Sequence, residues 1–135
     1  MAEPIEGRAR ELLEAPNFCH VATLRRDGSP HLNPVWVDVE DGLVVLNSAE
    51  GRAWPANARR DPRVTLSVMN LENPYEYVEI RGRVVEDTHE GADEHIDRMA
   101  MKYLGQETYP FRAEGEQRLI LRIEPERVHH YSPGG

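Results

Sequence analysis

Residues 43–63 read LVVLNSAEGRAWPANARRDPR, and the rest of the chain is organised around this stretch. The apolar run at 43–47 predicts a buried strand, and the small residues at 48–51 predict a turn. Because Pro55 lacks a backbone N–H and suits the first turn of a helix, we expect a short helix over about 55–60. A strand that leads through such a turn into a helix N-terminus presents free N–H groups and the positive end of the helix dipole. The stretch therefore predicts an anion-binding site.

The same stretch is locally basic within an acidic chain. Four arginines stand against two acidic residues, whereas the whole chain has a net charge of −8. These residues are Arg52, Arg59, Arg60, Arg63, Glu50 and Asp61. Ordinary solvent-exposed arginines would give the same local composition, so both interpretations stay open. The acidic balance of the chain argues against nucleic-acid binding, which needs a broad excess of Lys and Arg.

Length and composition are typical of one globular domain. The 135 residues are 39% hydrophobic and 30% charged, which is enough for one hydrophobic core. Cys19 is the single cysteine, so we expect a buried, unreactive thiol in a reducing compartment. The N-terminus is charged, and no apolar run approaches membrane-spanning length. We expect a single domain over residues 1–135, in the cytoplasm and without membrane contact.

Hydrophobic periodicity predicts a mainly β chain with inserted helices. Strands are expected at 18–25, 31–40, 43–47, 63–70, 75–88 and 119–123, with an extended tail at 128–131. Besides the helix at 55–60, helices are expected at 5–15 and between a cap at Asp87 or Thr88 and a closing Gly105. Asp-Gly pairs at 27–28 and 41–42 predict tight hairpin turns. About six antiparallel strands joined mainly by hairpins favour a small barrel.

Two residues within the expected strands predict irregular pairing. Pro34 cannot donate to a strand ladder, so we expect the sheet to open there or to have an edge, which leaves neighbouring backbone groups free. Gly82 predicts a bulge or bend in the strand 75–88.

The histidines do not have the spacing of a metal site. His89 and His95 are six residues apart and would lie on different faces of a helix, and the adjacent His129 and His130 would point oppositely from a strand. The sequence contains no His-Glu-x-x-His motif, nucleophile elbow, GxGxxG or P-loop. We therefore expect no metal and can name no catalytic side chain. If the chain is an enzyme, its chemistry is expected to come from a cofactor.

The order of several sequence strings resembles a known family. ATLRRDGSPHLNPVWV at 22–37 is followed by Ser-x-x-Gly-Arg at 48–52, ANARRDPRVTLSV at 56–68, NPYEYVEIRGRV at 73–84 and MKYLG at 101–105. Over residues 8–131 the chain resembles the split β-barrel flavin and deazaflavin oxidoreductases, that is, the pyridoxamine 5′-phosphate oxidase-like proteins. Within them it is most similar to the branch that uses the deazaflavin coenzyme F420.

The resemblance implies a split β-barrel, a homodimer and a cofactor site at the subunit interface. It implies that the cofactor ring lies beside the backbone of Pro34, Val35 and Trp36. It also implies that a phosphate-bearing tail is held by Asn47, Ser48, Gly51 and Arg52, with Asn57 close behind. Tyr75 and Tyr77 would reach the site from the other subunit, and a role in the interface alone fits them equally well.

One residue departs from the pattern that the resemblance implies. Trp54 stands where a lysine is expected to pair with cofactor phosphate, and tryptophan donates one hydrogen bond without charge. Loss of such a contact costs about 1.5–3 kcal/mol, or roughly ten- to a hundredfold in affinity. Four outcomes stay open: compensation by Arg59 or Arg60, a changed cofactor preference, weak cofactor binding, or stacking of Trp54 on a planar ring such as FMN or haem.

The expected function is that of an F420-dependent reductase that transfers a hydride to a small electron-poor substrate. Two alternatives stay open from the sequence: an FMN-binding oxidoreductase on the same fold, and a non-catalytic protein that binds a planar cofactor.

Overall fold

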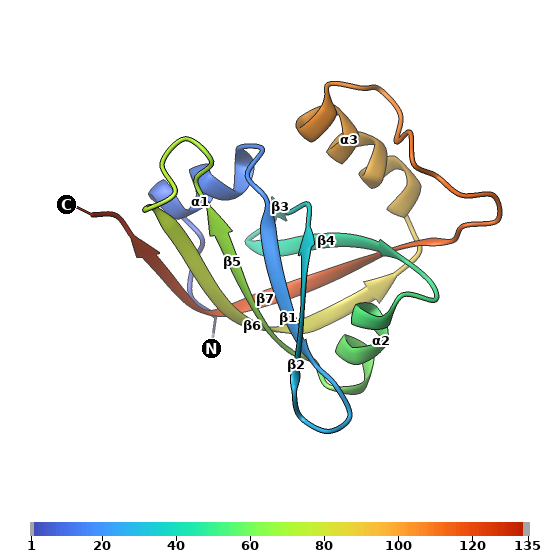
Figure 1. The fold of residues 1–135 in the computed structure, drawn as a ribbon, viewed down its shortest axis with the longest axis horizontal. Helices are drawn as coiled ribbons and strands as arrows, with labels where there is room; N and C mark the ends of the chain where they lie inside the picture. The colour runs from blue at the N-terminus through green and yellow to red at the C-terminus, as the bar shows by residue number, and fades with distance from the viewer. Residues whose placement is uncertain (1, 134–135) are drawn as a thin grey trace.

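The computed structural model describes residues 2–133 and shows a curved antiparallel sheet with helices at its ends and edges (Figure 1). The strands are β1 (Cys19–Leu24), β2 (Pro30–Val35), β3 (Asp38–Glu40), β4 (Leu43–Ala49), β5 (Arg63–Met69), β6 (Tyr77–Thr88) and β7 (Arg118–Tyr131). The helices are α1 (Gly7–Glu14), α2 (Ala53–Arg60) and α3 (Ala92–Leu104). The mainly β fold expected from the sequence is confirmed. That one domain spans 1–135 stays a prediction, and residues 1 and 134–135 lie outside the described residues.

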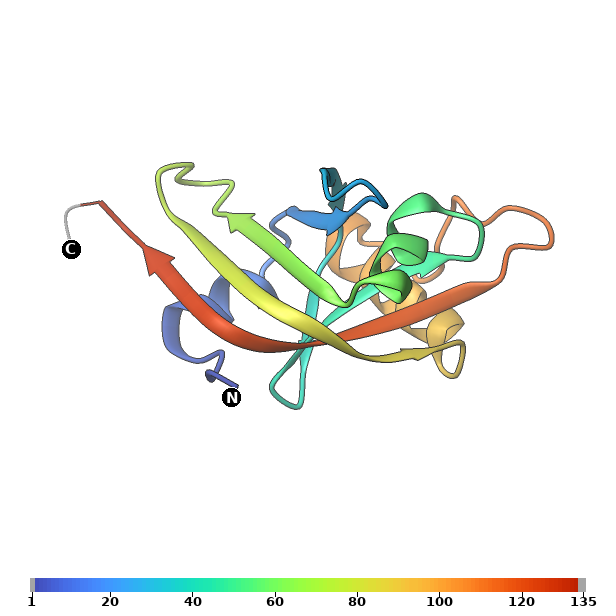
Figure 2. The same ribbon diagram turned by 90° about the horizontal axis from the view of Figure 1, so that it is seen from below.

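The sheet curls into a split barrel, and the strand order shows how. The seven strands follow the order β2-β1-β5-β6-β7-β4-β3, so the consecutive strands β2 and β3 lie at opposite ends of the sheet. Only Trp36 and Val37 connect them, which requires the two ends of the sheet to approach one another. The long strands β6 and β7 bend across the middle of the molecule (Figure 2).

The split in the barrel lies at Val37, where two side chains of α3 bond to the backbone in place of a neighbouring strand. The Val37 N–H donates to the Tyr103 hydroxyl at 3.0 Å, and the Val37 carbonyl accepts from Lys102 Nζ at 2.6 Å. The single strand expected at 31–40 is therefore wrong: it divides into β2 and β3 because Val37 bonds to side chains instead of a neighbouring strand. β2 is an edge strand, as Pro34 predicts, but the backbone groups freed at Val37 are already paired.

The other differences from the expected elements have local causes. Strands 119–123 and 128–131 form one strand, β7, because it pairs with both β4 and β6 along its length. Neither Asp87 nor Thr88 caps α3, because β6 continues to Thr88, which pairs with Ile120. Tyr75 lies in the turn before β6. Gly105 ends α3 in the left-handed conformation, as predicted.

Two glycine predictions are confirmed. Asp41 and Gly42 both have positive φ, 53° and 79°, as a tight hairpin between β3 and β4 requires. At Gly82 the register of β6 against β7 shifts, and a Cβ there would lie 2.4 Å from the Glu124 carbonyl oxygen. Any side chain would therefore force the two strands apart at this bulge.

The barrel interior is a continuous apolar core. Val21, Leu46, Leu66, Ile80 and Leu121 from five different strands are buried in it. The helix α1 adds Leu12 and Leu13, and α2 adds Trp54 and Ala58. Cys19 is buried in the same core, as predicted, and burial raises the pKa of its thiol to about 12. Within residues 2–133, none of the helices combines the length and apolar character needed to cross a membrane.

Candidate functional site

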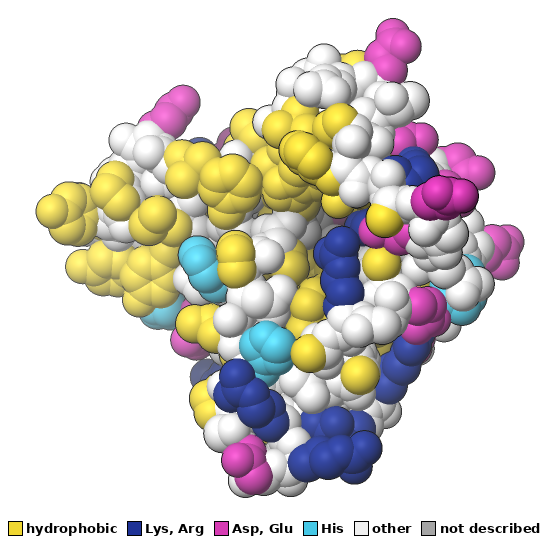
Figure 3. All heavy atoms as spheres, turned by 45° about the vertical axis from the view of Figure 1, so that its right-hand side comes forward, with side chains coloured by type: hydrophobic (Ala, Val, Ile, Leu, Met, Phe, Trp, Pro, Cys, Tyr) yellow, Lys and Arg dark blue, Asp and Glu magenta, His cyan; other side chains and the backbone are white. Residues whose placement is uncertain are grey.

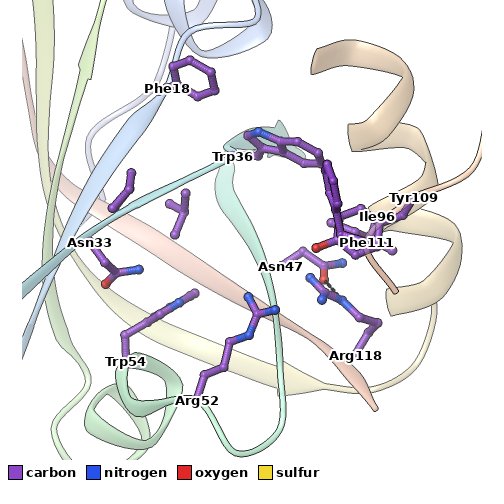
Figure 4. A pocket seen from close by; sticks show the side chains of 12 residues that line it. Phe18, Asn33, Trp36, Asn47, Arg52, Trp54, Ile96, Tyr109, Phe111 and Arg118 are labelled. Atoms are coloured by element: carbon purple, nitrogen blue, oxygen red, sulfur yellow. Dashed lines mark hydrogen bonds between the residues drawn. The ribbon is translucent and has the colours of Figure 1, made fainter. Parts of the chain in front are cut away.

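A pocket of about 390 Å³ opens between β2, β4, α3 and the loop that joins α3 to β7 (Figure 4). This volume lies within the range of small-molecule sites, about 300–1,000 Å³. Figure 3 shows hydrophobic and basic side chains meeting on one face of the molecule. The pocket joins an aromatic wall to a pair of arginines, and it has a different chemistry at each end.

The aromatic wall is built on Trp36, which follows β2. Its ring stacks on Tyr103 of α3 with centroids 5.0 Å apart and an interplanar angle of 5°. Tyr109 meets Trp36 edge-on at 5.9 Å, and Phe111 meets Tyr109 edge-on at 5.7 Å. Phe18 lines the pocket beside β2. Trp36 offers an apolar ring face to a planar ligand, and Tyr109 stands nearly perpendicular to it.

Tyr103 holds this wall in place from behind. Its hydroxyl donates to the Asn17 carbonyl at 2.7 Å and accepts from the Val37 N–H at 3.0 Å. Burial raises the pKa of Tyr103, so the hydroxyl stays protonated and keeps donating at any physiological pH. The orientation of Trp36 is therefore set by the same residue that fills the split in the barrel.

The cationic end of the pocket consists of Arg52 and Arg118. Arg118, the first residue of β7, is only 3% exposed, and its guanidinium lies 5.0 Å from the centre of the Tyr109 ring. Its Nε donates to Asn47 Oδ1 at 2.9 Å, and its Nη1 donates to Glu116 Oε1 at 3.1 Å. Arg52 Nη2 lies 3.6 Å from the same Glu116 oxygen. Two guanidinium groups thus share one carboxylate and leave net positive charge for an anionic ligand.

The remaining arginines of the stretch 43–63 are engaged elsewhere. Arg59 pairs with Glu50 and Asp87, and together with His89 it lowers the pKa of Glu50 to about 2. Arg60 donates to the Leu24 carbonyl at 2.7 Å, and Arg63 pairs with Asp61 at 2.7 Å. Neither Arg59 nor Arg60 lines the pocket, so the second positive charge comes from Arg118 instead.

Six of the eleven cofactor-binding residues expected from the resemblance line this pocket. They are Pro34, Val35, Trp36, Asn47, Arg52 and Trp54. Trp54 is 4% exposed, packs in the apolar core and also lines the pocket. The charged side chain of a lysine would not pack into the core in this way. The strand-turn-helix stretch therefore contributes Asn47, Arg52 and Trp54 to the pocket, and its binding of an anion stays a prediction.

The other five expected residues do not line the pocket. Ser48 follows Asn47 in β4, so its side chain points to the opposite face of the strand. It is fully buried, and its hydroxyl has no hydrogen-bond partner among the described residues. Gly51 forms the turn before α2 with φ 92°, and Asn57 Nδ2 donates to Thr23 Oγ1 at 3.3 Å. Tyr75 and Tyr77 lie far along the sheet, next to the β5–β6 turn.

Sequence reasoning missed the residues that the α3–β7 loop and β7 contribute. Tyr109 and Phe111 flank Pro110 in an otherwise polar loop, and an aromatic pair in such a loop is a functional signal. Arg118 opens a strand whose next residues, Leu119 and Ile120, are buried, and a charge at that point marks a site or an ion pair. Phe18, Asn33 and Ile96 complete the missed lining.

One group of the described side chains has metal-like spacing. Ligand atoms of Asp38, Glu40 and His95 lie within 4.8 Å of one another, a pairing that the sequence spacing did not reveal. Glu40, however, lies 3.3 Å from Arg98 and 3.9 Å from Arg122, and His95 Nε2 is bonded to Asp38 at 3.0 Å. Two guanidinium groups beside the cluster oppose a cation, so we assign no metal to it.

Comparison with known proteins gives a family match over nearly the whole chain. The model described as pyridoxamine 5′-phosphate oxidase matches residues 5–132. A solved F420 reductase is 29% identical over 89% of this chain and 94% of its own, with a TM-score of 0.80. The comparison with curated proteins found no match.

Two more distant structures share the fold. A conserved hypothetical protein of Mycobacterium tuberculosis is 23% identical over 98% of this chain and 88% of its own, with a TM-score of 0.71. The HupZ protein of Group A Streptococcus is 18% identical over 93% of each chain, with a TM-score of 0.66.

Proposed function

This chain belongs to the pyridoxamine 5′-phosphate oxidase family, and on that premise we propose that it is an oxidoreductase that uses coenzyme F420 to reduce a small electron-poor substrate. One observation carries the proposal: one pocket combines an aromatic wall, built on Trp36, with two arginines. A planar redox cofactor with an anionic tail needs both features. Similarity to an F420 reductase supports the choice of cofactor.

The residues of the pocket fit such a group. Asn33 lines the pocket, and its Oδ1 is buried with no hydrogen-bond partner among the described residues. A buried acceptor of this kind is normally satisfied, and a ligand N–H or O–H would satisfy it. Trp36 would lie against the ring, and Arg52 and Arg118 would bind the anionic tail.

The chain's own contribution is binding, orientation and exclusion of water. The twelve lining residues include no Ser, Cys, His, Asp or Glu, so the lining itself supplies no nucleophile or carboxylate base. The bound cofactor would supply the hydride. Tyr109 and Phe111 would hold the substrate against the ring and keep water from the reacting atoms.

Trp54 favours a second candidate, an FMN-dependent oxidoreductase or an FMN-binding protein. It replaces the expected lysine with a buried, uncharged ring, which removes a phosphate contact and adds a surface that stacks on flavin. The two candidates differ in the cofactor that the pocket holds, so one binding experiment separates them.

We also propose that the protein is a homodimer. Tyr77 of β6 pairs with Tyr131 of β7, their rings stack at 5.5 Å, and Met69 of β5 lies next in the register. Tyr75, 74% exposed, and Leu71, 50% exposed, extend this apolar surface. A second copy would cover the surface, and Tyr75 and Tyr77 would then reach the partner's pocket. Sedimentation of wild type and Tyr75→Asp tests this: a wild-type monomer would contradict it.

The deciding experiment is a parallel titration of the protein with F420 and FMN, followed by fluorescence. We expect F420 to bind at micromolar or lower concentration, and Arg52→Ala and Arg118→Met each to weaken it about tenfold or more. Arg26→Ala is the matched control, because Arg26 is an exposed arginine in the β1–β2 turn. Preferential binding of FMN would replace the first candidate with the second, and equal binding by all variants would contradict the anion site.

A further inference from the structure

The buried ring of His95 lies behind the pocket in a chain of hydrogen bonds that ends at Arg118. His95 on α3 has no exposed surface. Its Nε2 is 3.0 Å from Asp38 Oδ2, and its Nδ1 is 3.1 Å from Asn47 Nδ2. Asn47 Oδ1 in turn accepts from Arg118 Nε at 2.9 Å. Four side chains from β3, α3, β4 and β7 are thus connected in series.

The donor and the acceptor of each hydrogen bond in this series can be assigned from two groups that contact Asn47, namely Arg118 Nε and the Ala92 carbonyl. Arg118 Nε can only donate, so the atom of Asn47 that faces it is the oxygen. The Ala92 carbonyl can only accept, and it lies 2.9 Å from Asn47 Nδ2, which agrees with that orientation. The amide N–H that points at His95 must therefore be donated to ring Nδ1. His95 then carries its proton on Nε2 and donates it to Asp38.

Asp38 is suited to accept this hydrogen bond, because its carboxylate is ionised. Burial opposes ionisation, but the hydrogen bonds from His95 and from the Val39 N–H outweigh it, and the pKa of Asp38 is lowered. Each link between neighbouring members of the series then joins a donor to an acceptor. A neutral ring with its proton on Nε2 is the single state that satisfies them all.

A second proton on the ring would break the series. Nδ1–H would face the Asn47 amide N–H, so Asn47 would have to turn its amide over to accept it. The Asn47 oxygen would then face the Ala92 carbonyl, and its NH₂ would face Arg118 Nε–H. Both contacts would be repulsive, and Arg118 would lose the acceptor that holds its guanidinium in the pocket.

From this geometry we propose that His95 is a positioning residue: with Asp38 behind it, it holds Arg118 ready for an anionic ligand through Asn47, and only while its ring is neutral. This inference rests on the proposed function, in which Arg118 binds the anionic end of the cofactor. It makes anion binding at the pocket depend on the protonation of a residue that never touches the ligand.

Several other charged groups face this region, and the test must separate them from His95. β3 contributes Asp38 and Glu40, β7 contributes Arg118 and Arg122, and α3 itself contributes Arg98 and Lys102. Glu40 is paired with both Arg98 and Arg122, and Lys102 donates to the Val37 carbonyl. A substitution at position 95 leaves all of these in place.

Two substitutions make a matched pair. In His95→Gln, the side-chain oxygen can accept from Asn47 and the side-chain NH₂ can donate to Asp38, so the series is kept but cannot take up a proton. In His95→Leu, a side chain of similar size can do neither. Thermal unfolding of both variants establishes that they are folded before binding is measured.

F420 titrations at about pH 8 and at stepwise lower pH provide the first readout. We expect wild-type affinity to fall about tenfold as the pH is lowered, His95→Leu to bind about tenfold more weakly than wild type at pH 8, and His95→Gln to bind like wild type at pH 8. Titration of the cofactor itself affects all three proteins equally. The proposal would be overturned if His95→Leu bound F420 as tightly as wild type at pH 8, or if His95→Gln showed the same pH dependence as wild type.

The second readout needs no ligand. A long-range ¹H–¹⁵N spectrum of the labelled protein at about pH 8 should show His95 protonated on Nε2. The Arg118 Nε–H should exchange slowly with water in wild type and His95→Gln, and faster in His95→Leu. A ring protonated on Nδ1, or equal exchange in all three proteins, would overturn the proposal. If wild type binds neither F420 nor FMN, the proposed function fails while this readout still decides the role of His95.

Discussion

Replacement of Arg118 by methionine should destabilise the protein far more than an ordinary surface substitution. The change keeps much of the apolar stem and removes the guanidinium, which donates at 3.1 Å to Glu116 and at 2.9 Å to Asn47. The Glu116 side chain is 8% exposed, and its second oxygen has no partner among the described residues. After the substitution, Arg52 at 3.6 Å would be the one basic group left near this buried carboxylate among residues 2–133.

The magnitude follows from the burial of Glu116. Removing one partner of a buried ion pair costs about 3–5 kcal/mol, because the other charge is left uncompensated. Arg52 and water entering from the pocket lower this, so we expect about 3 kcal/mol for Arg118→Met. In Arg118→Met/Glu116→Gln the buried charge is gone, and about 2 kcal/mol of the loss should return. Glu116→Gln alone should cost less, about 1–2 kcal/mol, because the new amide oxygen can still accept from Arg118 Nη1 and Arg118 keeps its bond to Asn47.

Urea unfolding followed by circular dichroism measures these free energies, and a constant m-value shows that the comparison is valid. The double-mutant cycle isolates the coupling between Arg118 and Glu116. The reasoning is refuted if Arg118→Met costs less than about 1 kcal/mol, or if Glu116→Gln restores nothing to it.

Three further predictions concern the fold around the site. Gly82→Ala should cost about 2–3 kcal/mol in urea unfolding, because its Cβ would meet the Glu124 carbonyl oxygen at 2.4 Å, and a cost near zero would contradict the close packing of β6 and β7. Burial lowers the pKa of Lys102 to about 8, so between about pH 8 and pH 10.4 the folded chain binds fewer protons than the unfolded chain and this residue's contribution to stability rises with pH. Relative to Lys102→Met, wild type should gain about 1 kcal/mol per pH unit there, and a parallel pH dependence of the two proteins would disprove it. Cys19 should react with a thiol reagent only at the rate of unfolding, and rapid labelling of the native protein would show that the thiol is accessible.

Local signals in the sequence predicted much of the fold. The hairpin at Asp41 and Gly42, the bulge at Gly82 and the end of α3 at Gly105 each depend on the backbone conformation of a single residue, so a short stretch of sequence is enough to find them. The cap expected at Thr88 was wrong because pairing with Ile120 extends β6, and no local pattern near Thr88 reports on a strand that far away in sequence.

The candidate site could be predicted only in part, for a similar reason. Arg52 and Trp54 belong to the strand-turn-helix stretch, whose chemistry is visible in sequence order. Arg118 reaches the same pocket because β7 pairs with β4, which places it opposite Ala49 and within hydrogen-bond distance of Asn47. Such a meeting depends on the register of two strands that are some seventy residues apart, and the sequence alone does not provide it.

The two ligand-binding parts of the pocket belong to different kinds of structure, paired strands and a loop, and can therefore change independently in evolution. Arg118, which would bind the anionic end of a ligand, and Asn47, which holds its guanidinium, belong to paired strands, whereas Tyr109 and Phe111 belong to the α3–β7 loop. That loop is tied to α3 by Arg112, which pairs with Asp93 and Asp97, and contributes little to the barrel core. Substitutions in the loop can therefore change which molecules fit against the aromatic wall without disturbing the paired strands. Proteins with this barrel could then share one anion-binding site and differ in their substrates.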